Sequence, residues 1–549
     1  MVSSAKPPNI VILLADDMGW NDIGVHGSEV PTPNIDALAY NGIVLKRHYA
    51  QPSCTPSRSA LLSGKYPIRY GLQGYPLSSK SKYGLPTDIK IMPEVLKELG
   101  YRTHLVGKWH QGYPTWRHMP TRRGFDSFYG FLNGYLSYYD GVHCDSPSIG
   151  LDFRSDEEES WRSAYGKYLP EILSEKASAI VRNHSRHHKN DPLFLLVSMN
   201  APHAGGNRPF INEIPPVRHD GARFIADEKR RIFADVMRYV DDTLGNVTST
   251  LKAEGMLENS LILFLADNGG PSIDPIWNYG NAASNFPFRG TKMSMYEGGV
   301  RAAAVLWKSN MVSTPRVYDG LFHITDWLPT LISAAGGSRL EDLDGVDHWS
   351  ALLGLSPDDP RKELLVEIND QGDSWGYVSG NFKLVKSYNS TYRLSFADNY
   401  FSPPPEANPA GYQFQEVTAS QVAKAIGVKL NETACLEMRE KMTLTQHCTA
   451  DQMALALQHD CSADGCLYDI SEDPSECFDI AKQHPDLARE LFLKMKYYQD
   501  SMFKAPDLPL NNEPNVRNYF APSSAKSYKP FTLLTSLVSL ASIIRLCDK

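Results

Sequence analysis

Apolar runs of strand length, separated by helical patterns, constrain the fold of this chain more than any other feature. Residues 9–15 (NIVILLA) and 260–266 (SLILFLA) are short and continuously apolar, as expected of strands buried on both faces. Residues 227–255 carry apolar side chains at helical spacing between such runs. The alternation predicts an α/β fold with a large, mostly parallel mixed sheet sandwiched by helices.

The same criteria place further elements and a change of pattern near residue 355. Strands are predicted at 101–107 and 191–199, and helices at 32–42, 93–100 and 169–184. Beyond residue 355, short strands are predicted within 363–368, 375–380, 382–388 and 466–470, and a closing helix at 485–502. We therefore expect a smaller C-terminal antiparallel sheet with a packed helix. The expected divisions are an N-terminal extension (1–7), a large domain (8–355), a C-terminal α+β domain with a cysteine-rich insert (356–505) and a tail (506–549).

Charge and cysteine usage narrow the class of protein. The formal net charge of -8 argues against a nucleic-acid binder. Five of the eight cysteines crowd into one C-terminal stretch, which predicts disulfides and an oxidising compartment: Cys435, Cys448, Cys461, Cys466 and Cys477. The start, MVSSAKPPN, has no apolar segment typical of a signal peptide. The apolar tail is interrupted by Ser and Thr, so no membrane span is predicted there.

Two predicted strands end in oxygen-bearing side chains. Asp16 and Asp17 follow the strand at 9–15, and Asp267 and Asn268 follow the strand at 260–266. In open α/β sheets ligands bind beyond the carboxyl ends of the strands. Three carboxylates brought together repel one another, and a hard divalent cation, Ca²⁺ or Mg²⁺, would relieve that repulsion. Helix capping by Asp17 and a turn at Asn268 are the competing structural explanation for each pair alone.

Cationic side chains follow other predicted strands. Lys108 and His110 come after the strand at 101–107, and His203 comes after the strand at 191–199. Arg289 and Lys292 lie in a later loop bounded by glycines. Together with an oxygen-bound metal, these groups suit a tetrahedral oxyanion, either a phosphate or a sulfate ester.

Cys54 lies in the segment QPSCTPSRSALLSG, between two prolines and four residues before Arg58. Its residue type alone allows a half-cystine, a buried small hydrophobe or a reactive centre. The segment resembles the sulfatase signature C-x-P-S-R. The resemblance continues through LADDMGWNDIGVHG, TPNIDALA, VGKWH, PTRRGFD, ADNGG and RGTKMSMYEGGVR, and it covers most of residues 8–345. Within the sulfatase family, the chain looks most similar to the arylsulfatase B-like, N-acetylgalactosamine-4-sulfatase group.

The resemblance implies an alkaline-phosphatase-like fold and an enzyme that hydrolyses sulfate esters. It implies that Cys54 is converted after synthesis to formylglycine, an aldehyde. Metal ligands would be Asp16, Asp17, Asp267, Asn268 and the modified residue 54, with one Ca²⁺ as the expected ion and Mg²⁺ as the alternative. Arg58 and Lys108 would orient residue 54, and His110 would take a proton from its hydrate. His203 and Lys292 would bind sulfate and protonate the leaving alcohol.

The resemblance also implies the partners. The substrate would be a sulfated carbohydrate of the glycosaminoglycan type or an aryl sulfate, and a formylglycine-generating enzyme would modify residue 54. A lysosomal or secreted location would follow. Two alternatives remain open at this point: a phosphoester hydrolase of the related fold, and a non-enzymatic glycan-binding relative.

Overall fold

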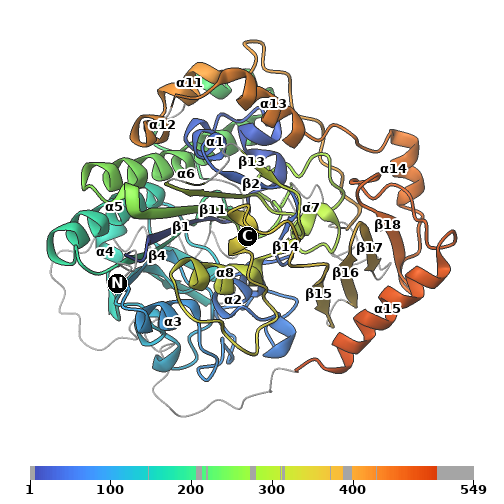
Figure 1. Cartoon of the computed structure of the whole chain (residues 1–549), viewed down its shortest axis with the longest axis horizontal. Coiled ribbons are helices and arrows are strands. Elements are labelled where there is room, and N and C mark those ends of the chain that lie inside the picture. The colour runs from blue at the N-terminus through green and yellow to red at the C-terminus, as the bar shows by residue number, and fades with distance from the viewer. Residues whose placement is uncertain are drawn as a thin grey trace, which may run out of the picture.

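The computed structural model describes residues 6–145, 148–205, 213–217, 220–272, 280–309, 311, 316–370, 373–387, 398–427 and 429–503. The predicted tail (506–549) therefore lies outside the described residues. Figure 1 shows a large central sheet with helices on both sides, and a smaller sheet at one edge of the molecule. The predicted fold class is confirmed.

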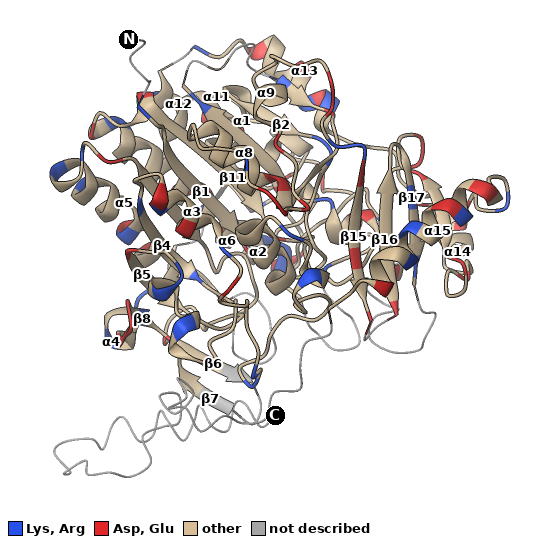
Figure 2. Cartoon of the chain, turned by 60° about the horizontal axis from the view of Figure 1, so that its bottom comes forward, with Lys and Arg blue, Asp and Glu red and all other residues tan. Residues whose placement is uncertain are grey.

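The large sheet has ten strands with parallel pairing at its centre. Its order is β13 (Arg316–Tyr318), β2 (Ile43–Leu45), β12 (Ala304–Lys308), β11 (Ser260–Ala266), β1 (Asn9–Ala15), β10 (Leu193–Ser198), β4 (Arg102–Lys108), β5 (Ser127–Phe131), β8 (Arg154–Ser155) and β9 (Glu158–Glu159). The strands from β11 to β5 run parallel, whereas β12, β8 and β9 pair antiparallel with their neighbours. Strands β1 and β11 are buried along their whole length and carry no charged residue in Figure 2, which explains their uninterrupted apolar sequences.

Helices cover both faces of this sheet. One face carries α1 (Pro33–Tyr40), α5 (Leu169–His187) and α6 (Glu228–Ala253). The other carries α2 (Cys54–Ser63), α3 (Met92–Glu98) and α8 (Trp327–Ala334), which pack on one another. Among the described helices, none combines the length and the apolarity that crossing a membrane requires.

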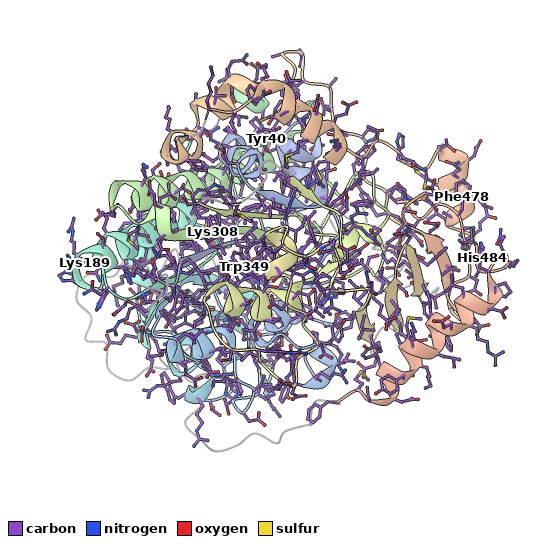
Figure 3. All side chains as sticks on the ribbon, in the orientation of Figure 1. Tyr40, Lys189, Lys308, Trp349, Phe478 and His484 are labelled. Carbon is purple, nitrogen blue, oxygen red and sulfur yellow. A yellow bond between two sulfur atoms is a disulfide. The ribbon has the colours of Figure 1, made fainter. Side chains whose placement is uncertain are left out.

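The smaller sheet is antiparallel, in the order β15 (Glu363–Asn369), β16 (Ser374–Ser379), β17 (Phe382–Lys386) and β18 (Cys466–Asp469). Helix α15 (Pro485–Asp500) packs on it through Leu491 and Met495. Figure 3 shows His484, just before α15, and Lys189, just after α5, at opposite edges of the molecule.

A buried ion cluster joins the smaller sheet to the segment that precedes β12. Lys383 of β17 contacts Glu297 at 2.8 Å and Glu476 at 3.0 Å, and Arg301 contacts Glu297 at 3.1 Å. All four side chains are buried. Such a cluster is costly to disrupt, because removing one partner leaves an uncompensated buried charge.

The segment between β17 and β18 contains α11 (Phe414–Ala419), α12 (Gln421–Ile426), α13 (Glu432–Met442) and α14 (Ala450–Ala456). Helices α11 and α12 lie over α1 rather than over the small sheet (Figure 1). Disulfides link Cys448 to Cys477 and Cys461 to Cys466, as the clustering predicted, whereas Cys435 is a buried free thiol.

Candidate active site

The carboxyl ends of β1 and β11 bring the two predicted acidic pairs together. These strands are parallel neighbours, with Ala15 opposite Ala266, so the residues that follow them meet at one edge of the sheet. The backbone N–H of Asp17 donates to Oδ1 of Asp267 at 3.1 Å, and Nδ2 of Asn268 donates to Oδ1 of Asp17 at 2.8 Å. Asp16 is also fully buried in this group.

Each carboxylate has a cationic partner. Nζ of Lys108, the last residue of β4, lies 2.9 and 2.8 Å from the two oxygens of Asp16. Nζ of Lys292 lies 2.6 and 2.8 Å from the two oxygens of Asp17. Arg58 of α2 contacts Oδ2 of Asp267 at 2.9 Å through Nε and 2.8 Å through Nη2.

Three carboxylates therefore face three cationic side chains, and the formal charges balance. Repulsion among the carboxylates, the argument made from the sequence, does not by itself require a metal ion. Burial raises the pKa of Asp16 to about 7, although Lys108 opposes this shift. Burial also acts on Asp17, but Lys292 and His203 outweigh it and lower the pKa of Asp17 below its ordinary value.

Other observations do favour a cation. Ligand atoms of Asp16, Asp17, Cys54 and His203 all lie within 4.8 Å of one another. The Oδ1 atom of Asn268 is buried without a hydrogen-bond partner, which suits an oxygen ligand of a hard ion. A divalent ion would also change the neutral group into a net positive one, as binding of an anionic ester requires.

Cys54 opens α2 and is 1% exposed. It is a free thiol in the structure, so the half-cystine interpretation is wrong. Burial raises the pKa of the Cys54 thiol to about 11, although Lys108 and Lys292 oppose this shift. An unmodified thiol would thus be protonated at neutral pH, which makes it a weak nucleophile and a weak ligand.

The two predicted histidines have one ring nitrogen tied to the backbone. Nε2 of His110 lies 2.8 Å from the carbonyl oxygen of Leu77, and its Nδ1 is buried without a hydrogen-bond partner. Nδ1 of His203 lies 2.7 Å from the carbonyl oxygen of Ala204, and its Nε2 lies 3.3 Å from Oδ2 of Asp17. If the tied nitrogens carry the protons, each free nitrogen is a proton acceptor. Burial lowers the pKa of both rings, that of His203 to about 3.

Backbone strain occurs at two of these residues. Asp17 has a φ of 66° and His110 a φ of 51°, in the left-handed region that non-glycine residues seldom occupy. Gly134 packs against His110, and a Cβ there would lie 2.7 Å from Cε1 of the ring. Strain of this kind clusters at functional sites, because surrounding contacts must hold it in place.

Arg289, which the sequence grouped with Lys292, does not join this cluster. Its guanidinium stacks over the ring of Tyr296 at 3.9 Å and donates to the carbonyl oxygen of Asp398 at 3.1 Å. It therefore binds the C-terminal segment to the loop between β11 and β12. The loop pattern indicated a cation but not the direction of its side chain.

The sequence also missed Ser198, the last residue of β10. Its hydroxyl accepts a hydrogen bond from Arg58 and donates to the carbonyl oxygen of Lys108 at 2.7 Å. Its position at the carboxyl end of a central strand was the signal that would have found it.

Comparison with known proteins agrees with this geometry. The family model described as Sulfatase matches residues 8–338. Mouse (Mus musculus) arylsulfatase J is 39% identical over 371 residues, which are 67% of this chain and 59% of that protein. Human (Homo sapiens) N-acetylgalactosamine-6-sulfatase is 33% identical over 367 residues, which are 63% of this chain and 66% of that protein. The matches thus span less than two thirds of these relatives.

Solved structures show a similar fold. Ps i-CgsB in complex with k-i-k-neocarrahexaose has a TM-score of 0.67 at 24% identity, covering 92% of this chain and 96% of that chain. The PsFucS1 sulfatase from Pseudoalteromonas sp. has a TM-score of 0.65 at 24% identity, covering 92% of each chain.

Proposed function

Since this chain belongs to the sulfatase family, we propose that it is a sulfuric ester hydrolase acting on sulfated carbohydrates and aryl sulfates. The observation that carries the proposal is the meeting of Cys54, Asp16, Asp17 and His203 within 4.8 Å at the carboxyl edge of the sheet. Cationic side chains surround this cluster. A buried nucleophile position beside a metal-binding group and several cations suits attack on an anionic ester.

Residue 54 is the proposed nucleophile, after conversion of Cys54 to formylglycine. The raised pKa of the thiol supports a need for conversion, because an unmodified Cys54 would stay neutral. As a hydrated aldehyde, the modified residue would supply one hydroxyl to attack sulfur and a second whose deprotonation releases sulfate. Arg58 and Lys108 are the proposed orienting groups.

The proposed metal ligands are Asp16, Asp17, Asp267, Asn268 and residue 54. Their oxygen-rich composition favours Ca²⁺ over softer metals, with Mg²⁺ as the alternative. The bound ion would supply positive charge that stabilises negative charge on the ester oxygens. Lys108, Lys292 and Arg58 would keep the carboxylates from outweighing that charge.

Two histidines are the proposed proton carriers. His110, with Nε2 bound to the carbonyl oxygen of Leu77, offers Nδ1 as a base. His203 would carry a second proton at Nε2 to protonate the leaving oxygen. A bound sulfate ester brings negative charge next to the ring and favours that proton. Lys292 would bind the sulfate group and share this role.

The finer assignments are also proposals. We propose an N-acetylgalactosamine-4-sulfatase-like activity, although the curated relatives named above are an arylsulfatase J and an N-acetylgalactosamine-6-sulfatase. Residues 8–355 would form the catalytic domain and 356–505 the C-terminal domain. A formylglycine-generating enzyme would be a partner, and a lysosomal or secreted location is consistent with the two disulfides.

Matched substrates test the proposal. Protein made in a secretory host should hydrolyse para-nitrophenyl sulfate with calcium present and leave para-nitrophenyl phosphate almost untouched. Preference for the phosphate would identify a phosphoester hydrolase instead. Binding of a sulfated glycan without turnover, in protein whose residue 54 is converted, would identify a glycan-binding relative.

A further inference from the structure

The imidazole of His203 is held by a loop that no sequence signal connected to the site. This loop (132–141) follows β5, on the far side of β4 from β10, and it contributes two tyrosines. The ring of Tyr135 stacks on the imidazole with centroids 5.8 Å apart and planes 12° apart. The hydroxyl of Tyr138 donates to the carbonyl oxygen of His203 at 2.8 Å and lies 3.4 Å from that of Asn200. One tyrosine thus contacts the ring of His203 and the other its backbone.

The two tyrosines are themselves fixed. His143 of β6 (Val142–Asp145) lies against the Tyr135 ring at 4.5 Å, and its Nδ1 is 3.0 Å from the carbonyl oxygen of Tyr135. Strand β6 pairs antiparallel with β7 (Ser148–Leu151). Tyr138 is 1% exposed, so its hydroxyl has little freedom to turn away.

The start of the loop is anchored by one buried carboxylate. Asp152, with no exposed surface, accepts from the backbone N–H groups of Leu132 and Asn133 at 2.8 to 3.1 Å. It also accepts from the side-chain amide of Asn133 at 2.7 Å. A loop tied down in this way acts as a rigid support rather than a mobile lid.

The contacts on His203 restrict its ring in complementary ways. The bond from Nδ1 to Ala204 points Nε2 toward the site, but it leaves the ring free to swing about that bond. A parallel aromatic face removes this remaining freedom. The Tyr138 hydroxyl fixes the backbone from which the ring projects. Proton transfer in a transition state depends on such placement, since small displacements of the acid lower the rate strongly.

We propose that Tyr135 and Tyr138 are positioning residues that hold His203 in line with the leaving oxygen of the substrate; the inference rests on the proposed sulfatase function. As the oxygen of residue 54 bonds to sulfur, the bond from sulfur to the leaving oxygen breaks. Its electron pair stays on the leaving oxygen, which takes the proton from Nε2 of His203. The tyrosines act through His203, Tyr135 on its ring and Tyr138 on its backbone. We name the pair the tyrosine clamp.

A displaced acid matters most when the leaving group is basic and least when it is already stable as an anion. The test therefore uses aryl sulfates of similar shape, graded from the para-nitrophenyl to the para-methoxyphenyl ester. In Tyr135→Leu we expect kcat to fall about 10-fold on the para-methoxyphenyl ester and less than about 3-fold on the para-nitrophenyl ester. Tyr138→Phe should also lower kcat more on the ester with the more basic leaving group. Tyr135→Phe keeps an aromatic ring and should show the same dependence of kcat on the leaving group as the wild type.

Tyr129→Leu is the matched control. Tyr129 is a half-buried tyrosine of β5 that packs edge-on against Phe153 at 4.9 Å, outside the contacts of His203. Its replacement should change all esters equally. An equal loss on every ester in Tyr135→Leu would overturn the clamp. So would a fall in calcium affinity that accounts for the lost activity, because His203 would then be held as a metal ligand.

A second measurement does not depend on turnover. In histidine-labelled protein, the Cε1–H resonance of His203, assigned with His203→Gln, should be narrow and shifted by the Tyr135 ring current. Tyr135→Leu should remove the shift and broaden the line. An unchanged resonance would overturn the clamp even in an inactive protein. A wild type that hydrolyses none of the esters, with the resonance behaving as expected, would refute the proposed function. It would leave only the structural part of the proposal, that Tyr135 holds the ring of His203.

Discussion

The ammonium group of Lys108 contacts both carboxylate oxygens of Asp16, at 2.9 and 2.8 Å, with neither side chain exposed. The strongest metal-site candidate in the described part of the chain therefore contains its own counterion. A buried carboxylate that loses such a partner destabilises the fold by about 3–5 kcal/mol. An added cation can replace the lost charge.

Lys108→Met should therefore lower the melting temperature measured in the presence of a chelator. Adding calcium should raise the melting temperature of this variant by more than it raises that of the wild type. The reason is that an ion bound only by the folded state stabilises it by mass action. Thermal melts with and without calcium measure the difference. Lys383→Met, which breaks a buried ion pair at the other sheet, is the control. The same calcium response in both variants would contradict the counterion role.

Chelation should abolish sulfate ester hydrolysis, and Asp267→Asn should do the same with less loss of stability than Asp267→Ala. Both variants lose the oxygen that pairs with Arg58, but Asn keeps an oxygen that can accept from the backbone N–H of Asp17, whereas Ala loses that acceptor too. Either change removes a charge from an oxygen-ligand site and weakens it severely. Activity assays combined with calcium-binding calorimetry check this. Full activity of a verified metal-free sample would remove the ion from the mechanism.

Mass spectrometry of the peptide that contains residue 54 should find an aldehyde that reacts with hydrazides, in protein from a secretory host. Cys54→Ser should bind calcium normally but release no more than a single equivalent of alcohol, with the sulfate trapped on the serine. Serine has only one hydroxyl and cannot expel sulfate by re-forming an aldehyde. Unmodified cysteine in the active enzyme, or repeated turnover by the serine variant, would refute the chemistry proposed for residue 54.

Stability should decrease from acidic to neutral pH because of Asp36. Burial raises the pKa of Asp36 from 3.8 to about 6, where it accepts from the hydroxyl of Tyr412 at 2.6 Å. Between these values the folded state keeps a proton that the unfolded state has lost, so this contribution is full below about pH 4 and is lost as pH rises through about 6. The shift corresponds to about 3 kcal/mol.

Denaturation midpoints from about pH 4.5 to about pH 7.5 test this against Asp36→Asn, which mimics the protonated acid. The wild type should lose stability relative to the variant as pH rises. A constant difference across this range would show that Asp36 does not titrate in it.

Cys448→Ala should lower the free energy of unfolding by about 2–4 kcal/mol, because it opens the disulfide to Cys477. Cys435→Ala removes a buried sulfur without a disulfide and should cost less than about 1.5 kcal/mol. Urea unfolding of both variants provides the comparison. Equal losses would show that the link between the segment before α14 and the segment after β18 adds nothing beyond packing.

The sequence predicted the central strands and the acidic end of the sheet because their causes are local. Strand β11 has the predicted bounds, 260–266, since a strand buried on both faces must be apolar throughout. Asp16 and Asp267 meet because adjacent parallel strands end at one edge. Both features could be predicted without knowing the conformation of the loops.

The features that the sequence did not predict depend on tertiary contacts. Arg289 turns toward Tyr296 and Asp398, and nothing in its own loop specifies that direction. Tyr135 meets His203 only because their loops lie side by side at the end of the sheet. The counterions of the carboxylates were identified as residues but not as partners, because pairing requires the distances between strand ends.

The burial of Cys54 limits when the residue can be modified. With 1% of its surface exposed, the residue is inaccessible to another enzyme once α2 has packed against its neighbours. The conversion proposed for residue 54 would then have to precede the packing of α2. A molecule that folds before conversion would remain inactive. The amount of active enzyme would therefore be set during synthesis and could not be raised later by modifying folded protein.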